Sequence, residues 1–286
     1  MGIRNALLAA ALAQTPISAH ADDTLRADTD IVFEAVAEAV TDAKMVRVIE
    51  IDHARLAAGE GVEMPPSRVL LFSDPGVNAA ILSENIRAGL DLPFRVLSYG
   101  DEAKPSLSYT SSAFIAKRHG LEGSAALADF DERLQTVLRA VDGADPSPVP
   151  TDAVERDFGI IEIASAYDVA ETVVRLEKAV TAQTDTIWFG EIDFMKEAAA
   201  FDVALPAAKL LLFGGPAPGG VAMADYPAIG LDAFCQKLLV YEGTSGNAVV
   251  LFNDIAAFAQ LYYGSSIEPH AMLNKRLSAT FSAAVQ

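Results

Sequence analysis

The sequence has few of the residues that usually indicate a function. Its 286 residues include one cysteine, Cys235, and four histidines, so an intrachain disulfide and a cysteine-based metal cluster are both excluded. Cationic residues are also scarce, because 21 lysines and arginines stand against 39 aspartates and glutamates, a formal net charge of −18. A surface with this charge repels phosphate groups, so we expect neither nucleic acid nor an anionic membrane as a partner.

Long apolar runs and catalytic motifs are missing as well. No stretch reaches the roughly 18 consecutive apolar residues of a membrane-spanning helix. The glycine-rich segment at residues 214–220 lacks the lysine of a phosphate-binding loop, and neither a Gly-x-Ser-x-Gly nor a dinucleotide-binding spacing occurs. The sequence therefore predicts no metal site, and it leaves the cofactor and any catalytic residue undetermined.

The N-terminus has the pattern of an export signal. Arg4 supplies a positive charge, residues 6–13 form a short apolar run, and Ala19-His20-Ala21 resembles a cleavage site. We therefore predict a signal peptide over residues 1–21, cleavage after Ala21, and a periplasmic or secreted mature chain. The alternative is a frayed cytosolic helix, because the apolar run is short and rich in alanine.

The chain contains the same unit twice. Residues 65–99 and 206–241 each carry an apolar strand, a Pro/Gly turn, a short helix that ends at Gly89 or Gly230, and a second strand. Three motifs recur in register: Glu50-Ile51-Asp52 as Glu191-Ile192-Asp193, Leu70-Leu71-Phe72 as Leu211-Leu212-Phe213, and Gly89-Leu90-Asp91 as Gly230-Leu231-Asp232. This register indicates a tandem duplication. We assign residues 22–141 to the first repeat, 142–157 to a proline-rich linker and 158–286 to the second repeat.

Local patterns predict an α+β fold for each repeat. Apolar residues at helical spacing predict helices over residues 31–43, 125–141 and 168–182. Alternating or β-branched runs predict strands over residues 45–51, 69–72, 186–192 and 210–213. The simplest layering is an antiparallel sheet covered by helices on one face in each repeat. Packing of the two repeats about a pseudo-two-fold axis, as in a homodimer, would cover their open edges and faces.

Several short motifs resemble the bacterial domain of unknown function 302 family. They are Leu71-Phe72-Ser73-Asp74-Pro75, Leu212-Phe213-Gly214-Gly215-Pro216, Gly89-Leu90-Asp91-Leu92-Pro93, Ile51-Asp52-His53 and Arg118-His119-Gly120-Leu121. The resemblance covers nearly the whole mature chain, twice. It implies two-layer domains of TATA-binding-protein-like topology that pair as a dimer, and it implies no activity. The second repeat departs from the pattern, because Phe194 and the Tyr262-Tyr263 pair replace the two histidines.

The Pro/Gly loops of the two repeats are the first candidate binding site. The candidate residues are Ser73, Asp74, Gly214, Gly215, Gly219 and Gly220. A glycine-rich turn that opens a helix exposes backbone N–H groups toward a carboxylate or phosphate, and glycine admits a ligand close to the backbone. The alternative is that glycine and proline only shape the strand-to-helix turn.

The histidines His53 and His119 are the second candidate site. Imidazole can serve as a general base, a proton shuttle or a ligand of a metal or haem. Without a carboxylate cluster the pair is a poor zinc set, and each histidine could instead be structural. Asp52 is expected to cap the helix that follows it, and His270 is expected to be a solvent-exposed cap of the last helix.

Together these observations favour a non-catalytic module that binds a small ligand or a partner in the groove between the repeats, using His53, His119 and the glycine loop. Two alternatives stay open. One is a small enzyme with His53 as general base beside Asp52, which requires His53 and His119 to share a pocket. The other is a structural or interaction protein without a pocket.

Overall fold

The structure is a computed structural model that describes residues 17–101, 104–142 and 144–286. The first helix, α1 (Ile17–Asp42), runs through the predicted cleavage point after Ala21. Most of the predicted signal peptide lies outside the described residues, so export stays a prediction. Within the described residues, no helix is both long and apolar enough to cross a bilayer.

The first sheet contains five strands in the spatial order β1-β2-β3-β4-β5. They are β1 (Val46–Asp52), β2 (Ser67–Ser73), β3 (Phe94–Asp101), β4 (Lys104–Tyr109) and β5 (Pro146–Pro148). Neighbouring strands are antiparallel except β4 and β5, which are parallel. The covering helices are α1 and α5 (Ala125–Leu138), and the Phe130 ring of α5 stacks on Phe94 of β3 with centroids 4.1 Å apart.

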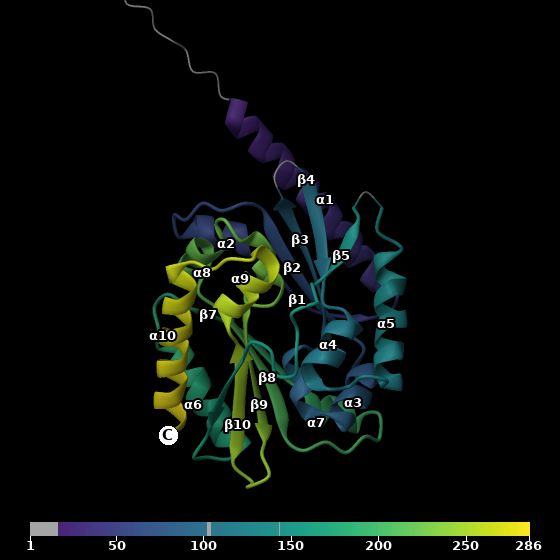
Figure 1. The fold of residues 1–286 in the computed structure, drawn as a ribbon, viewed down its shortest axis with the longest axis vertical. Coiled ribbons are helices and arrows are strands. Elements are labelled where there is room, and N and C mark those ends of the chain that lie inside the picture. The colour runs from purple at the N-terminus through teal and green to yellow at the C-terminus, as the bar shows by residue number, and fades with distance from the viewer. Residues whose placement is uncertain (1–16, 102–103, 143) are drawn as a thin grey trace, which may run out of the picture.

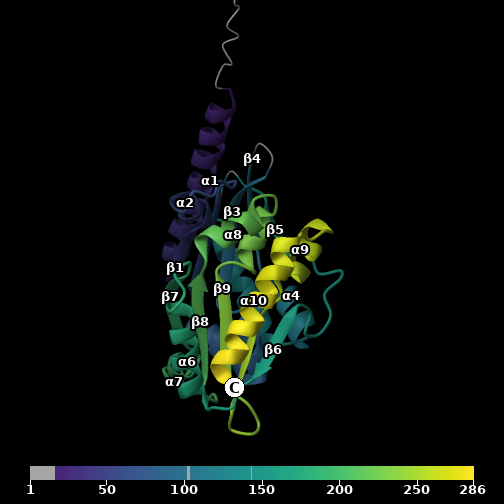
Figure 2. The same ribbon diagram turned by 90° about the vertical axis from the view of Figure 1, so that its left-hand side faces the viewer.

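The second sheet has the order β6-β10-β9-β8-β7 and is antiparallel throughout. Its strands are β6 (Ile160–Ala164), β7 (Ile187–Asp193), β8 (Ala208–Gly214), β9 (Gln236–Glu242) and β10 (Ala248–Asn253). Helices α6 (Val169–Thr181) and α10 (Glu268–Val285) cover one face, and Figure 2 shows α10 running across it. The Phe281 ring of α10 meets Phe213 and Phe252 edge-on, which fixes this helix to β8 and β10.

The repeats pack as two copies of one unit. The strand order β1-β2-β3-β4 recurs as β7-β8-β9-β10, and Leu71 faces Arg95 as Leu212 faces Lys237. The helices in the strand connections are α2 (His53–Gly59), α3 (Pro75–Glu84), η1 (Ile86–Leu90), α4 (Ser112–His119), α7 (Phe194–Ala199), α8 (Pro216–Met223) and η2 (Pro227–Leu231), whereas α9 (Ile255–Tyr263) follows the last strand and leads into α10. Helix α2 packs on α8, and α3 packs on α7, in a pseudo-two-fold arrangement (Figure 1).

The predicted α+β architecture is confirmed, with two five-stranded sheets each covered by helices. The structure adds one feature within the predicted linker, because Pro146–Pro148 pairs with β4 and completes the first sheet. In the second repeat the fifth strand, β6, instead precedes the other four in the chain. The TATA-binding-protein-like topology stays a prediction.

Candidate functional site

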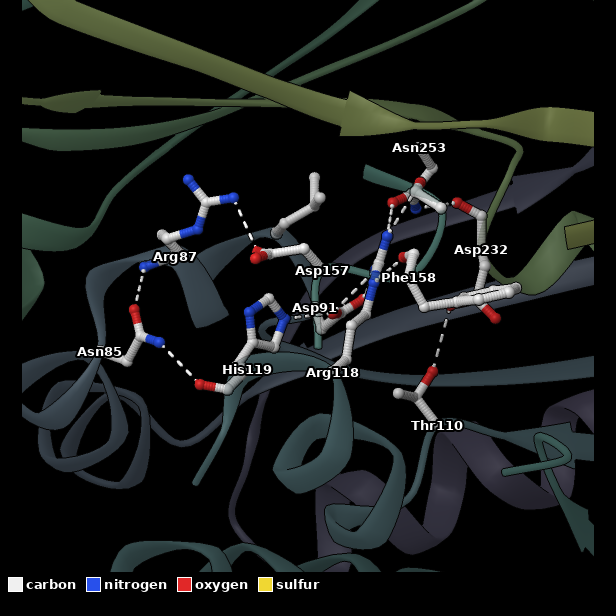
Figure 3. Close-up of polar contacts among 12 residues, drawn as sticks. Asn85, Arg87, Asp91, Thr110, Arg118, His119, Asp157, Phe158, Asp232 and Asn253 are labelled. Atoms are coloured by element: carbon white, nitrogen blue, oxygen red, sulfur yellow. Dashed lines mark hydrogen bonds and ion pairs between the residues drawn. The ribbon is translucent and has the colours of Figure 1, made fainter. Parts of the chain in front are cut away.

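The repeats meet at a buried network of charged side chains (Figure 3). Asp91, at the end of η1, and its counterpart Asp232, at the end of η2, have fully buried side chains. Arg95 donates hydrogen bonds through Nη2 to Asp232 Oδ1 at 2.6 Å and to Asp91 Oδ1 at 3.2 Å. Arg118 of α4 donates to both carboxylate oxygens of Asp91, at 2.8 and 2.9 Å. Two arginines therefore balance two aspartates inside the interface.

Two further side chains bond to the aspartates of this network. His119 Nε2 lies 2.6 Å from Asp91 Oδ2, and the hydroxyl of Tyr262 donates to Asp232 Oδ2 at 2.7 Å. Burial alone would raise the pKa of Asp91, but the Arg118 charge, the His119 hydrogen bond and the Arg95 charge hold it well below its usual range. His119 is thus bound to a structural carboxylate, which supports its alternative interpretation as a structural histidine.

Lys237 on β9 is the third basic residue of the interface. It is the counterpart of Arg95, it is 2 % exposed, and its Nζ has no hydrogen-bond partner among the described residues. Burial and the Arg95 charge lower its pKa to about 7, although Asp232 and Asp91 act in the opposite direction. Because the two aspartates are already paired, the neutral amine is the form that this position accommodates best.

A small cavity lies where α2 of the first repeat meets α8 of the second. Its volume is about 30 Å³, room for one or two water-sized groups. Five of the eight predicted site residues line it, namely His53, Gly214, Gly215, Gly219 and Gly220. The rest of the wall is formed by Ile51, Leu56, Phe189, Pro216, Met223, Phe234 and Cys235. Both repeats therefore contribute to one mostly apolar cavity.

His53 of the first repeat forms part of the cavity wall. The residue is 7 % exposed, and its Nε2 makes no hydrogen bond of ordinary geometry with any of the described residues. Its ring lies against Gly230, where a Cβ atom would be 3.1 Å from His53 Cδ2. Burial lowers the pKa of His53 to about 4, and a weak hydrogen-bonding contact with the Gly230 backbone and the Asp52 charge offset this only in part. At neutral pH the imidazole is therefore uncharged.

The first repeat fills the corresponding space with side chains. Ser73 Oγ accepts a hydrogen bond from Asn78 Nδ2 at 2.9 Å. Asp74 accepts from the Val77 backbone N–H at 3.3 Å, which caps α3, and from Arg133 Nε at 2.9 Å. Ser73 and Asp74 thus have structural partners, and neither lines the cavity.

The second repeat lacks these side chains. The counterparts of Ser73, Asp74 and Asn78 are Gly214, Gly215 and Gly219, so the space that they would occupy stays open. A second cavity of about 30 Å³ lies between α8 and α10 and shares Gly215, Gly219 and Phe234 with the first. The loss of side chains from one loop accounts for both cavities.

Two further features of the glycine loop limit which ligands it can bind. A Cβ at Gly220 would lie 2.6 Å from Ala57 Cβ, so glycine is required here for the contact between α2 and α8. At the start of α8, Pro216 and Pro218 have no N–H, and the Gly219 N–H bonds to Gly215 O at 2.8 Å. Two prolines therefore remove N–H donors from the first turn of α8 and a third donor is used within the helix, which makes the loop a poor anion site.

Three other sequence predictions can be compared with the structure. Asp52 caps α2 by accepting from Arg55 N at 2.8 Å, as predicted. Cys235 is a buried small residue, as predicted, and burial raises the pKa of its thiol to about 11. The prediction that His270 caps the last helix is confirmed, because its Nδ1 accepts from the Ile267 backbone N–H at 3.3 Å. The prediction that it is solvent-exposed is wrong, because the side chain is buried and its Nε2 lies 2.8 Å from Ala222 O.

Sequence reasoning did not predict the central network. Its signal was present in the repeated Gly-Leu-Asp motif, which places Asp91 and Asp232 within apolar segments of both repeats. A buried carboxylate requires a cation or several donors, so this repetition could have indicated the ion pairs with Arg95 and Arg118.

Comparison with known proteins gives two kinds of match. A family profile matches both repeats, and individual curated proteins match part of the chain. The "Fluoride-specific ion channel FluC 1" of Brucella suis biovar 1 is 33 % identical over 104 residues, covering 36 % of this chain and 40 % of that protein. "Fluoride-specific ion channel FluC 2" of Brucella melitensis biotype 1 is also 33 % identical over 104 residues, with 36 % and 38 % covered. The chain thus spans about two fifths of the length of these curated relatives.

A solved structure and a family profile complete the comparison. The crystal structure of the uncharacterized conserved protein DUF302 from Bacillus stearothermophilus is 14 % identical, with a TM-score of 0.37, and the match covers 45 % of this chain and 98 % of that one. The profile "Domain of unknown function DUF302" matches residues 23–141 and again residues 161–284. The chain therefore belongs to the DUF302 family and carries two copies of its domain.

Proposed function

We propose that this protein is a binding module that holds a small ligand in the cavity between α2 and α8. The observation that carries the proposal is that His53 lines the cavity while its buried Nε2 makes no hydrogen bond of ordinary geometry with the described residues. Leaving a buried polar atom without a partner costs about 1–3 kcal/mol. The second repeat avoids this cost at the equivalent position, because Phe194 lies over Gly89 as His53 lies over Gly230. A ligand that bonds to His53 would offset the cost.

The cavity limits the size and charge of that ligand. A volume of about 30 Å³ is far too small for a porphyrin. Phosphate and carboxylate are disfavoured because His53 is neutral and the prolines at the start of α8 donate no hydrogen bonds. The formal net charge of −18 also repels anions. The ligand is therefore a compact species that an imidazole nitrogen and an apolar wall can hold.

Binding is better supported than catalysis. The enzyme alternative needs His53 and His119 in one pocket, but His119 does not line the cavity and is bonded to Asp91. The proposed orienting carboxylate, Asp52, caps α2 and pairs with Arg55. We further propose that the mature chain is exported and acts as a pseudo-dimer within one polypeptide.

A ligand panel on the full chain tests this function. Thermal-shift and calorimetric titrations would use fluoride, because of the relatives' names, together with chloride, phosphate, soft and hard metal salts and haem. His53→Phe introduces the residue that the second repeat has at the equivalent position. Gly219→Asn likewise introduces the residue of the first repeat, Asn78. Met272→Leu alters an exposed methionine and serves as the control.

We expect one class of ligand to raise the Tm of the wild type and of the Met272→Leu control. The same ligand should lose its effect on His53→Phe and Gly219→Asn, with the circular dichroism of both variants unchanged. The proposal is overturned if no ligand shifts the wild type, or if both cavity variants respond as the wild type does.

A further inference from the structure

Three side chains with soft donor atoms line the cavity between α2 and α8. They are Met223 on α8, Cys235 just before β9, and His53, whose Nε2 makes no hydrogen bond of ordinary geometry within the part of the chain that the structure describes. All three are at least nine-tenths buried, at 7 %, 1 % and 4 % exposure. Met223 and Cys235 come from the second repeat and His53 from the first, so the set forms only when the repeats pack together.

The donor types select among metals. Thiolate and thioether sulfur favour Cu(I), and imidazole also suits copper, whereas magnesium and calcium require oxygen ligands. The cavity wall contains no aspartate, glutamate, asparagine or glutamine. Among the described residues, no group of three His, Cys, Asp or Glu side chains could hold a metal, but this set omits the thioether that Met223 supplies.

Charge balance favours a monovalent ion over a divalent one. A neutral imidazole, a neutral thioether and one thiolate carry a total charge of −1, which a monovalent cation cancels. A divalent ion would leave a net positive charge in an apolar cavity, and an uncompensated buried charge is strongly unfavourable.

We propose that this cavity binds one soft monovalent metal ion of the Cu(I) type, with His53 Nε2, Met223 Sδ and Cys235 Sγ as its ligands. The inference rests on the proposed function and names the ligand class for the same cavity. On binding, the Cys235 thiol transfers its proton to solvent, and the sulfur lone pair forms the metal bond. No electron is transferred, because the ion enters and stays in the monovalent state.

This inference departs from the sequence-based expectation of no metal site. That expectation considered histidines with carboxylates and clusters of cysteines, which are the patterns of zinc sites. His53 is separated from Met223 by 170 residues and from Cys235 by 182 residues in the sequence. No local spacing could therefore indicate the set.

Titration of the full chain with Cu(I), in competition with a colorimetric Cu(I) chelator and with Ag(I) as a redox-inert second probe, tests the inference. The variants are Cys235→Ala, Met223→Leu and His53→Phe, with the exposed Met272→Leu as a control. X-ray absorption of the Cu(I) form provides an independent readout of the sulfur and nitrogen ligands. Met223→Leu is close to volume-conserving and keeps the test valid if Cys235→Ala folds poorly.

We expect one Cu(I) per wild-type chain and sulfur and nitrogen in its first coordination shell. Each ligand variant should weaken binding by more than the roughly 10–100-fold that loss of an outer ligand partner costs, whereas Met272→Leu should bind as the wild type does. Binding that is unchanged in all three ligand variants overturns the inference. If neither Cu(I) nor Ag(I) binds but another ligand of the panel binds in a way that depends on His53, the metal assignment is wrong and the proposed function is supported. If no ligand of either experiment binds, both the metal assignment and the proposed function are wrong.

Discussion

Arg95 of the first repeat and Asp232 of the second form a hydrogen-bonded ion pair of 2.6 Å with no side-chain exposure on either residue. Asp232 is the counterpart of Asp91, which pairs with Arg118 in the same network. The interface between the repeats is thus held by charges that no solvent reaches. This buried network explains why the two repeats form one unit rather than two independent ones.

Removal of one partner from this pair should be severe. Asp232→Ala leaves Arg95 buried with an incomplete set of acceptors, and loss of one partner from a buried pair costs about 3–5 kcal/mol. The measurement is the free energy of unfolding in urea. Asp185→Ala is the matched control, because its pair with Arg276 is 39–41 % exposed and such pairs contribute about 0–1 kcal/mol. Equal losses in the two variants would contradict the role assigned to the network.

Acid should weaken the same network through Asp91. Its pKa in the folded protein lies well below the usual range, whereas an unfolded aspartate titrates near pH 3.9. The stabilisation is therefore fully present above about pH 4 and is lost as the pH falls through the folded pKa. Asp91→Asn should be less stable than the wild type at pH 7, and the difference should shrink below about pH 4.

Urea unfolding of both proteins between pH 7 and pH 2.5 measures this difference. Carbon NMR of the Asp91 carboxyl group provides a second measurement if Asp91→Asn folds poorly. A carboxyl group that titrates near the ordinary aspartate value would refute the assignment of the low pKa.

His53→Phe should stabilise the protein while it removes the ligand. Phenylalanine already occupies this position in the second repeat, where Phe194 is 1 % exposed. The substitution removes an unpartnered buried nitrogen, so we expect a gain of about 1 kcal/mol in the free energy of unfolding. Differential scanning calorimetry of the ligand-free proteins measures it. A loss of more than about 2 kcal/mol would instead indicate a packing or hydrogen-bonding role for the imidazole.

A single repeat should not persist as a folded monomer. Residues 22–150 include β5 but would expose Asp91, Arg95 and Arg118 together with the apolar surface around η1. We expect a dimer or an aggregate in size-exclusion chromatography with light scattering, while the full chain runs as one compact species. A stable monomeric fragment with native circular dichroism would refute the account of the interface.

Much of the fold was predictable because it depends on local patterns. The duplication, the strands around residues 45–51 and 210–213 and the Asp52 cap follow from short-range periodicity and capping chemistry. The fifth strand at Pro146–Pro148 was missed, because its pairing depends on β4 and two of its three residues are prolines.

The candidate site was predictable only in part. Glycine content identified the loop at Gly214–Gly220, and the aligned repeats identified His53 as a residue that Phe194 replaces. The sequence did not indicate that Met223 and Cys235 line the same cavity, nor that His119 belongs to the buried ion-pair network. These relationships arise from the packing of one repeat on the other, which local spacing does not encode.

The most direct measurement is a crystal structure of the full protein soaked with Ag(I), with anomalous scattering used to locate the ion. The account predicts one silver peak per chain inside the cavity, within bonding distance of His53 Nε2, Met223 Sδ and Cys235 Sγ. Silver found only on surface residues, with the cavity unchanged and His53 Nε2 still without a partner, would contradict it.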